Sequence, residues 1–190
     1  MNNTHHKEMK TKQILYGFLL CYLTAAYTAC TQKQTQTPET TAQTSTETTT
    51  DGDNQYTDFE LPGMHNNLVR VSDYVKNNKY TLIDFWASWC GPCRAEMPTV
   101  VKAYADYHTK GLEVIGVSLD NDHEAWVNAI SELNMTWPQM SDLKGWECAG
   151  AQLYNVQAIP ANVLVDQQGR MIAKDLRGSE LLDKMAELLN

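Results

Sequence analysis

A buried strand that runs into a helix through two cysteines constrains the fold of this chain most. The run Tyr80–Ala87 is mostly apolar and rich in aromatic and branched side chains, which predicts a buried strand. Cys90 and Cys93 follow it, and residues 91–108 have the pattern of a helix. The free N–H groups and dipole at a helix start stabilise an anion, here a thiolate. Cysteines three residues apart on a helix share a face, so this pair can close a disulfide.

Residues 56–190 predict one α/β domain, because strand patterns alternate with helix patterns around a mixed central sheet flanked by helices. A turn with Pro62-Gly63 and Asn66-Asn67 predicts an N-terminal hairpin. The other expected elements are strands at 112–119, 135–140, 162–166 and 170–173, and helices at 72–76, 123–134, 146–153 and from 179 onward. We expect Asp120-Asn121-Asp122 and Ser179 to cap two of these helices, and Trp126, Trp137 and Trp146 to lie in the core.

The first 29 residues have the pattern of a signal peptide. Three lysines precede the apolar, uncharged run 14–29, which at 16 residues is marginally short for a membrane span. The end of this run, Thr28-Ala29-Cys30, resembles the lipobox of bacterial lipoproteins, although Tyr27 departs from it. That resemblance implies lipidation of Cys30; soluble secretion and a retained membrane helix are the alternatives.

Residues 30–55 predict a disordered, Thr-rich tether. Ten of the twenty residues 31–50 are threonine, and such a segment buries too little apolar surface to order itself. Removal of residues 1–29 would leave 12 of the 15 basic and 22 of the 23 acidic residues, for a formal charge of −10. This acidic balance argues against a nucleic-acid partner.

The segment Ile83–Cys93 reads Ile-Asp-Phe-Trp-Ala-Ser-Trp-Cys-Gly-Pro-Cys and resembles the active-site strand and loop of thioredoxins. The runs Cys90–Pro98 and Ala158–Ala161 are similar to the membrane-tethered TlpA/ResA type of bacterial envelopes. The resemblance covers residues 56–190 and implies a thioredoxin-like fold with a central strand–helix insert before Ile159-Pro160. It also implies a thiol–disulfide oxidoreductase, with reduction of disulfides in envelope proteins as the favoured direction.

The resemblance implies a location and partners as well. The expected location is the periplasmic side of a bacterial membrane, with a lipid anchor to that membrane. Apocytochrome c is among the candidate substrates, and an envelope reductase would need re-reduction by a membrane electron donor. No cofactor is expected.

The two cysteines have distinct expected roles. Cys90, nearer the helix start, is the expected nucleophile, and Cys93 is the expected resolving thiol. A zinc site would need two more ligands at suitable spacing, and the histidines are scattered singly, so no metal site is expected.

Two carboxylates are candidate proton relays. Asp84 interrupts the apolar strand at the position of the buried thioredoxin acid, unless it lies at an edge and is solvated. Glu96 shares the helix face of Cys93, where the envelope type has a functional glutamate; a solvated surface residue is the alternative. For substrate binding, the resemblance implies a cis Pro160 beside the cysteines, with Ile159 backbone groups and Trp89 forming the docking surface.

Two other functions stay open. A peroxiredoxin-like peroxidase shares the fold, but that family needs a threonine where this chain has Ala87. A non-enzymatic metallochaperone would use a Cys-x-x-x-Cys motif, and the spacing here is one residue shorter. The left-over Cys148 is interpreted as a small buried hydrophobe, with a third redox thiol as the alternative.

Overall fold

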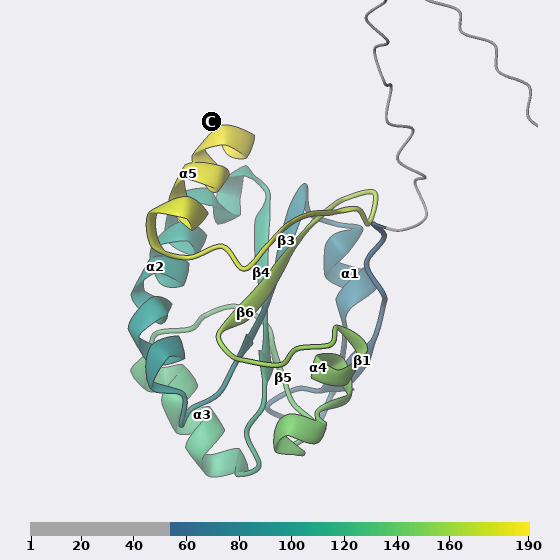
Figure 1. The fold of residues 1–190 in the computed structure, drawn as a ribbon, viewed down its shortest axis with the longest axis vertical. Coiled ribbons are helices and arrows are strands. Elements are labelled where there is room, and N and C mark those ends of the chain that lie inside the picture. Colours follow the sequence, from purple (N-terminus) through teal and green to yellow (C-terminus); the bar gives the residue numbers. More distant parts are fainter. Residues whose placement is uncertain (1–53) are drawn as a thin grey trace, which may run out of the picture. The chain divides into compact units, whose positions relative to one another are not determined.

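The computed structural model describes residues 54–190 of the chain (Figure 1). The expected signal peptide 1–29, Cys30 and residues 31–53 of the expected tether lie outside this part. The elements in chain order are β1 (Glu60–Pro62), β2 (Leu68–Arg70), α1 (Val71–Val75), β3 (Tyr80–Trp86), α2 (Gly91–Tyr107), η1 (His108–Lys110), β4 (Leu112–Ser118), α3 (His123–Glu132), β5 (Gln139–Met140), η2 (Gly145–Glu147), α4 (Ala149–Leu153), β6 (Ala161–Asp166), β7 (Met171–Lys174) and α5 (Gly178–Leu189).

Five strands form one mixed sheet in the order β5-β4-β3-β6-β7, and β1 and β2 form a separate hairpin. The central strand β3 runs parallel to β4 on one side and antiparallel to β6 on the other. The predicted mixed sheet and N-terminal hairpin are therefore confirmed. Because β3 is paired along both edges, the loop at its carboxyl end leaves a firmly held strand, and this loop leads to Cys90.

Helices cover both faces of the sheet. Figure 1 shows α2, α3 and α5 on one side and α1 and α4 on the other, and α2 packs directly against α5. This cover leaves β4 buried along its whole length and β3 buried at all but its first residue, which explains why both strands have near-continuous apolar sequences. The predicted insert is present, since α3, β5 and α4 lie between β4 and β6.

The last helix does not begin as expected. Its N-cap position is Arg177, which makes no side-chain cap bond, and Ser179 lies inside the helix. The prediction that Ser179 caps this helix is therefore wrong. The N–H group of Gly178, the first residue of α5, instead donates its hydrogen bond to the side chain of Glu96. By contrast, the Asp122 side chain caps α3 by accepting a hydrogen bond from the Ala125 N–H group at 2.7 Å.

The first described residues contact the edge of the sheet. The Asn54 carbonyl accepts a hydrogen bond from the Met171 N–H group, and Gln55 forms an isolated bridge to Arg170. Within residues 54–190 no helix combines the length and the apolar character needed to cross a bilayer.

Candidate redox site

Cys90 and Cys93 meet at the start of α2 and are joined by a disulfide, with their Cα atoms 5.3 Å apart. Cys90 is the N-cap residue, and its Sγ accepts a hydrogen bond from the Cys93 N–H group at 3.2 Å. Cys90 is 5% exposed and Cys93 is 1% exposed. An incoming thiol therefore reaches the sulfur of Cys90 more easily than that of Cys93. The N-terminus of α2 also faces the Cys90 sulfur.

The segment before β6 lies beside this disulfide. The peptide bond between Ile159 and Pro160 is cis, as the resemblance implied, and the Ile159 carbonyl oxygen lies 3.7 Å from Cys90 Sγ. In residues 54–190 no backbone hydrogen bond uses the Ile159 N–H or carbonyl group. The Ile159 backbone is therefore free to pair with an extended partner strand next to the reactive sulfur.

Asp84 is a buried carboxylate in the central strand. It stands opposite Gly116 of β4 and Asn162 of β6 and is 3% exposed, so the interpretation of a solvated edge residue is wrong. Burial raises the pKa of Asp84 to about 7; the positive charge of Arg177 lowers it and the negative charge of Glu96 raises it. A carboxyl group with this pKa exchanges a proton readily near neutral pH.

Glu96 is half-buried on α2, and it is not a free surface side chain. Its Oε1 accepts a hydrogen bond from the backbone N–H group of Gly178 at 2.8 Å, at the first residue of α5. The negative charge of Glu96 acts on Asp84 and raises its pKa, so the two expected relay residues influence each other electrostatically. Glu96 therefore holds the start of α5 and also carries a charge that acts on the buried acid.

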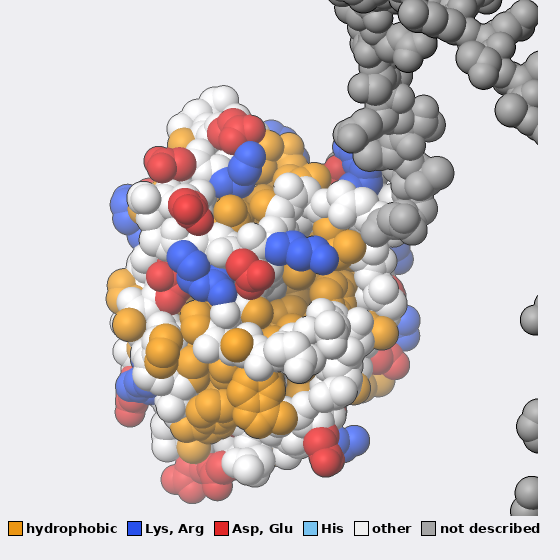
Figure 2. All heavy atoms as spheres, in the orientation of Figure 1, with side chains coloured by type: hydrophobic (Ala, Val, Ile, Leu, Met, Phe, Trp, Pro, Cys, Tyr) orange, Lys and Arg blue, Asp and Glu red, His pale blue; other side chains and the backbone are white. Residues whose placement is uncertain are grey.

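Two exposed tryptophans lie side by side, and one of them, Trp89, directly precedes Cys90. Trp89 is 52% exposed and Trp146 of η2 is 45% exposed, and their ring centroids lie 6.2 Å apart. Trp126 and Trp137 are buried as expected, but the prediction that Trp146 lies in the core is wrong. The periodicity of a short segment does not reveal that its tryptophan packs against another exposed ring instead of the core. Figure 2 shows hydrophobic side chains gathered between the positions of α3 and α4.

Asp120 is a site residue that sequence reasoning did not identify. Its buried carboxylate accepts hydrogen bonds from the Ser88 N–H group at 3.0 Å, the Ser88 hydroxyl at 2.6 Å and the Ser118 hydroxyl at 2.7 Å. This bonding ties the loop before Cys90 to the end of β4. The sequence signal for it is an aspartate directly after a buried strand, a position that also suits a helix cap.

Cys148 is a free thiol buried in the core, and burial raises its pKa. A protonated thiol is a poor nucleophile, so the structure favours the interpretation of a small buried hydrophobe.

The fold and the disulfide-bonded pair define a thioredoxin-like domain of the thiol–disulfide oxidoreductase class. The chain belongs to the AhpC/TSA family, whose profile matches residues 53–174. It is similar to the thiol-disulfide oxidoreductase ResA of Oceanobacillus iheyensis, with 34% identity over 122 residues. That match covers 64% of this chain and 60% of the relative, so it leaves part of the relative's length unmatched.

Solved structures show the same similarity. The thioredoxin domain of a thiol-disulfide oxidoreductase from Bacteroides vulgatus has a TM-score of 0.66 and 32% identity, covering 72% of this chain and 96% of that one. A thiol-disulfide oxidoreductase from Bacteroides fragilis has a TM-score of 0.66 and 32% identity, covering 71% of this chain and 99% of that one. The expected thioredoxin-like fold is confirmed, as is the expected class of oxidoreductase.

Proposed function

We propose that this protein reduces disulfides in proteins of the bacterial cell envelope through the Cys90–Cys93 couple. The observation that carries the proposal is the disulfide at the start of α2, whose outer sulfur lies 3.7 Å from the Ile159 carbonyl oxygen. Within residues 54–190 this carbonyl accepts no backbone hydrogen bond. This geometry supports a partner strand that brings its own disulfide onto Cys90.

The reaction is an exchange of sulfur–sulfur bonds. The Cys90 thiolate of the reduced protein attacks one substrate sulfur, so a mixed disulfide forms and a substrate thiolate leaves. Cys93 then attacks the Cys90 sulfur, which releases the second substrate thiolate and closes the Cys90–Cys93 disulfide. Two electrons pass to the substrate, and two protons end on its thiols.

Proton transfer in this scheme falls to the two carboxyl groups. Cys93 must lose its proton before it attacks, and Asp84, with its pKa of about 7, is suited to accept it. Glu96 lies three residues after Cys93 on α2 and is the second candidate relay. Trp89, Ile159 and the cis Pro160 form the docking surface for the substrate, and the contact between the two rings adds Trp146 to it.

The proposed location is the periplasmic side of a bacterial membrane, with Cys30 as the lipid-bearing anchor and the Thr-rich segment as the tether. The N-terminal pattern supports the location, and the named ResA relatives support the class of reaction. Apocytochrome c is among the substrates that we would test first. In an oxidising compartment the protein then needs a membrane electron donor to regenerate its dithiol.

Variants of the two cysteines test the mechanism. We expect Cys90→Ser to abolish reduction of a protein disulfide and to form no mixed disulfide with the substrate. Cys93→Ser should instead accumulate a mixed disulfide through Cys90, visible by mass spectrometry and lost on addition of dithiothreitol. Cys148→Ala is the matched control and should keep wild-type turnover, because Cys148 is buried away from solvent.

The reduction potential tests the direction. The Gly-Pro pair between the cysteines is that of thioredoxin, which is a strong reductant at roughly −270 mV. A potential of the Cys90–Cys93 couple below about −200 mV would support reduction. A value well above it would favour an oxidase or isomerase and contradict the proposed direction.

A further inference from the structure

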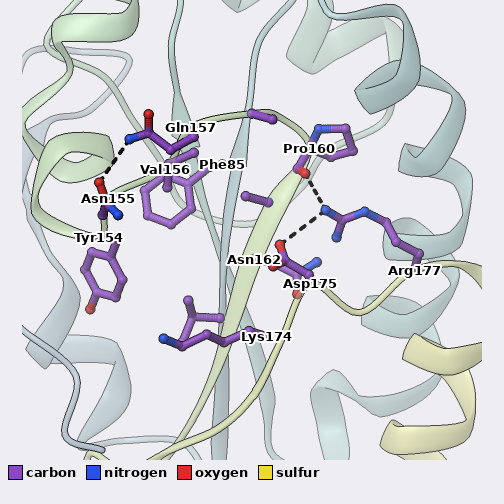
Figure 3. Close-up of a pocket in the computed structure, with 13 residues that line it drawn as sticks. Phe85, Tyr154, Asn155, Val156, Gln157, Pro160, Asn162, Lys174, Asp175 and Arg177 are labelled. Atoms are coloured by element: carbon purple, nitrogen blue, oxygen red, sulfur yellow. Dashed lines mark hydrogen bonds and ion pairs between the residues drawn. The ribbon is translucent and has the colours of Figure 1, made fainter. Parts of the chain in front are cut away.

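The loop between β7 and α5, residues 175–177, contacts the cis-proline loop, the segment before β6 that contains Ile159 and Pro160, through Arg177. One terminal nitrogen of Arg177, Nη2, donates a hydrogen bond to the Pro160 carbonyl and lies 3.4 Å from Asp175 Oδ1. The other, Nη1, donates to the Leu176 carbonyl at 2.9 Å. Figure 3 shows this side chain extending from its loop toward Pro160. Arg177 therefore connects two loops that are separated along the chain by two strands.

Side chains on both sides hold this loop in place. Asn162 of β6 donates from Nδ2 to the Leu176 carbonyl at 2.9 Å and accepts at Oδ1 from the Leu176 N–H group at 3.0 Å. Glu96 accepts from the Gly178 N–H group. Because Asn162 is the register partner of Asp84, this double attachment fixes the loop beside the buried carboxylate.

The charge of Arg177 also acts on the buried acid. Burial is the largest effect and raises the pKa of Asp84, while the guanidinium of Arg177 opposes it from the loop before α5. Glu96 of α2 adds to the effect of burial. Of the two charged groups that shift the pKa of Asp84, Arg177 is the positive one.

We propose that Arg177 is a positioning residue that holds the cis-proline loop for substrate docking and balances the charge around Asp84. With the Pro160 carbonyl bonded to Arg177, the backbone groups of Ile159 are the ones left free beside Cys90. The Arg177 side chain thus couples the cis-proline loop to Asp84, the proposed proton relay. The role of Arg177 in substrate docking rests on the proposed function. Its effect on the protonation of Asp84 can be measured without any substrate.

The test compares Arg177→Gln and Arg177→Lys with the matched control Lys174→Gln. Lys174 is an exposed cation at the end of β7 and has no hydrogen bond to Pro160. Together with Pro160 and Arg177 it lines a pocket of about 420 Å³ (Figure 3). The first measurement follows the Asp84 carboxyl carbon by ¹³C NMR across pH in the oxidised protein. We expect Arg177→Gln to raise the titration midpoint by on the order of one pH unit, whereas Arg177→Lys and Lys174→Gln leave it near the wild-type value.

The second measurement is KM for a protein disulfide. Both Arg177 variants should raise KM about five-fold, the loss expected for one hydrogen bond, because lysine keeps the charge without the planar group of hydrogen-bond donors. Lys174→Gln should leave KM unchanged.

An unchanged midpoint and an unchanged KM in Arg177→Gln would overturn the inference, and so would an equal shift of the midpoint in Lys174→Gln. If Arg177→Gln does not fold, the KM of Arg177→Lys decides the docking part. A wild-type protein that reduces no protein disulfide would refute the proposed function alone, because the NMR midpoint would still test the role of Arg177.

Discussion

Asp84 stands in the central strand among apolar side chains, and it stays protonated in the folded protein to about pH 7. In the unfolded chain the same group loses its proton near its ordinary pKa of 3.8. Between these values the native state binds more protons than the unfolded state, so the free energy of unfolding falls as pH rises. Well above pH 7 the free energy of unfolding falls no further through this group, and the Asp84 carboxylate remains as a destabilising charge in the core.

We predict that Asp84→Asn removes this pH dependence and stabilises the fold at pH 8. The shift of about three pKa units corresponds to roughly 4 kcal/mol as an upper bound, since each unit is about 1.4 kcal/mol. Urea unfolding at pH 4.5 and pH 8 measures the effect, with the exposed Asp183→Asn as control. The prediction is contradicted if the free energy of unfolding changes by the same amount between pH 4.5 and pH 8 in the variant and in the wild type. Turnover should fall if Asp84 takes the Cys93 proton.

Local patterns predicted Asp84, Cys90 and Cys93, because the chemistry of these residues contrasts with the sequence around them. The roles of Asp120 and Arg177 were not predicted. Asp120 bonds to Ser88, which is 32 residues away, and Arg177 bonds to Pro160, which is 17 residues away. Such partners are set by the arrangement of strands, and no short spacing in the sequence reveals them.

Helix α5 depends on another helix for its first hydrogen bond. The Arg177 side chain gives no cap bond, and Glu96 of α2 accepts from the Gly178 N–H group. The sequence predicted a cap at Ser179 because serine is a common N-cap residue, and the true acceptor lies 82 residues earlier. By contrast, most strands and helices were predicted close to their actual bounds, because their apolar periodicity is local. The insert is the exception: the strand expected at 135–140 is only Gln139–Met140, and the helix expected at 146–153 is a 3-10 turn followed by α4.

Two substitutions of Glu96 separate its structural role from its proposed chemical role. Glu96→Gln keeps an oxygen that can accept from Gly178, so the free energy of unfolding should change little while proton transfer is lost. Glu96→Ala should lower the free energy of unfolding by about 1–2 kcal/mol, the typical effect of removing a cap. Chemical denaturation and turnover measure the two effects, with the exposed Glu180→Ala as control. Equal stability of the two Glu96 variants would contradict the structural role.

Across the whole domain, the proposed docking surface combines segments that are far apart in the chain. Trp89 follows β3, Trp146 belongs to the insert, and Ile159 precedes β6. The insert was predicted as an element, but its contribution to the surface was not, since the contact between the two tryptophans exists only in the folded domain. An exposed pair of aromatic rings, one of them on the residue before Cys90, is suited to bind apolar side chains of a protein substrate.

We predict that Trp146→Ala raises KM for a protein disulfide several-fold and leaves the reduction of a small disulfide unchanged. The free energy of unfolding should change by less than about 1 kcal/mol, because the ring is 45% exposed. Steady-state kinetics with both substrates make the measurement. Leu153→Ala, a comparably exposed residue of the same insert, serves as control. An equal loss with both substrates would show that Trp146 acts on the cysteines and not on docking.

The buried Cys148 gives the folded domain an internal label. In the reduced native domain a thiol reagent should modify Cys90 and then Cys93, while Cys148 is fully shielded within the core. Modification of this third thiol therefore counts the molecules that have opened, and its rate under native conditions reports the stability of the core without any added probe.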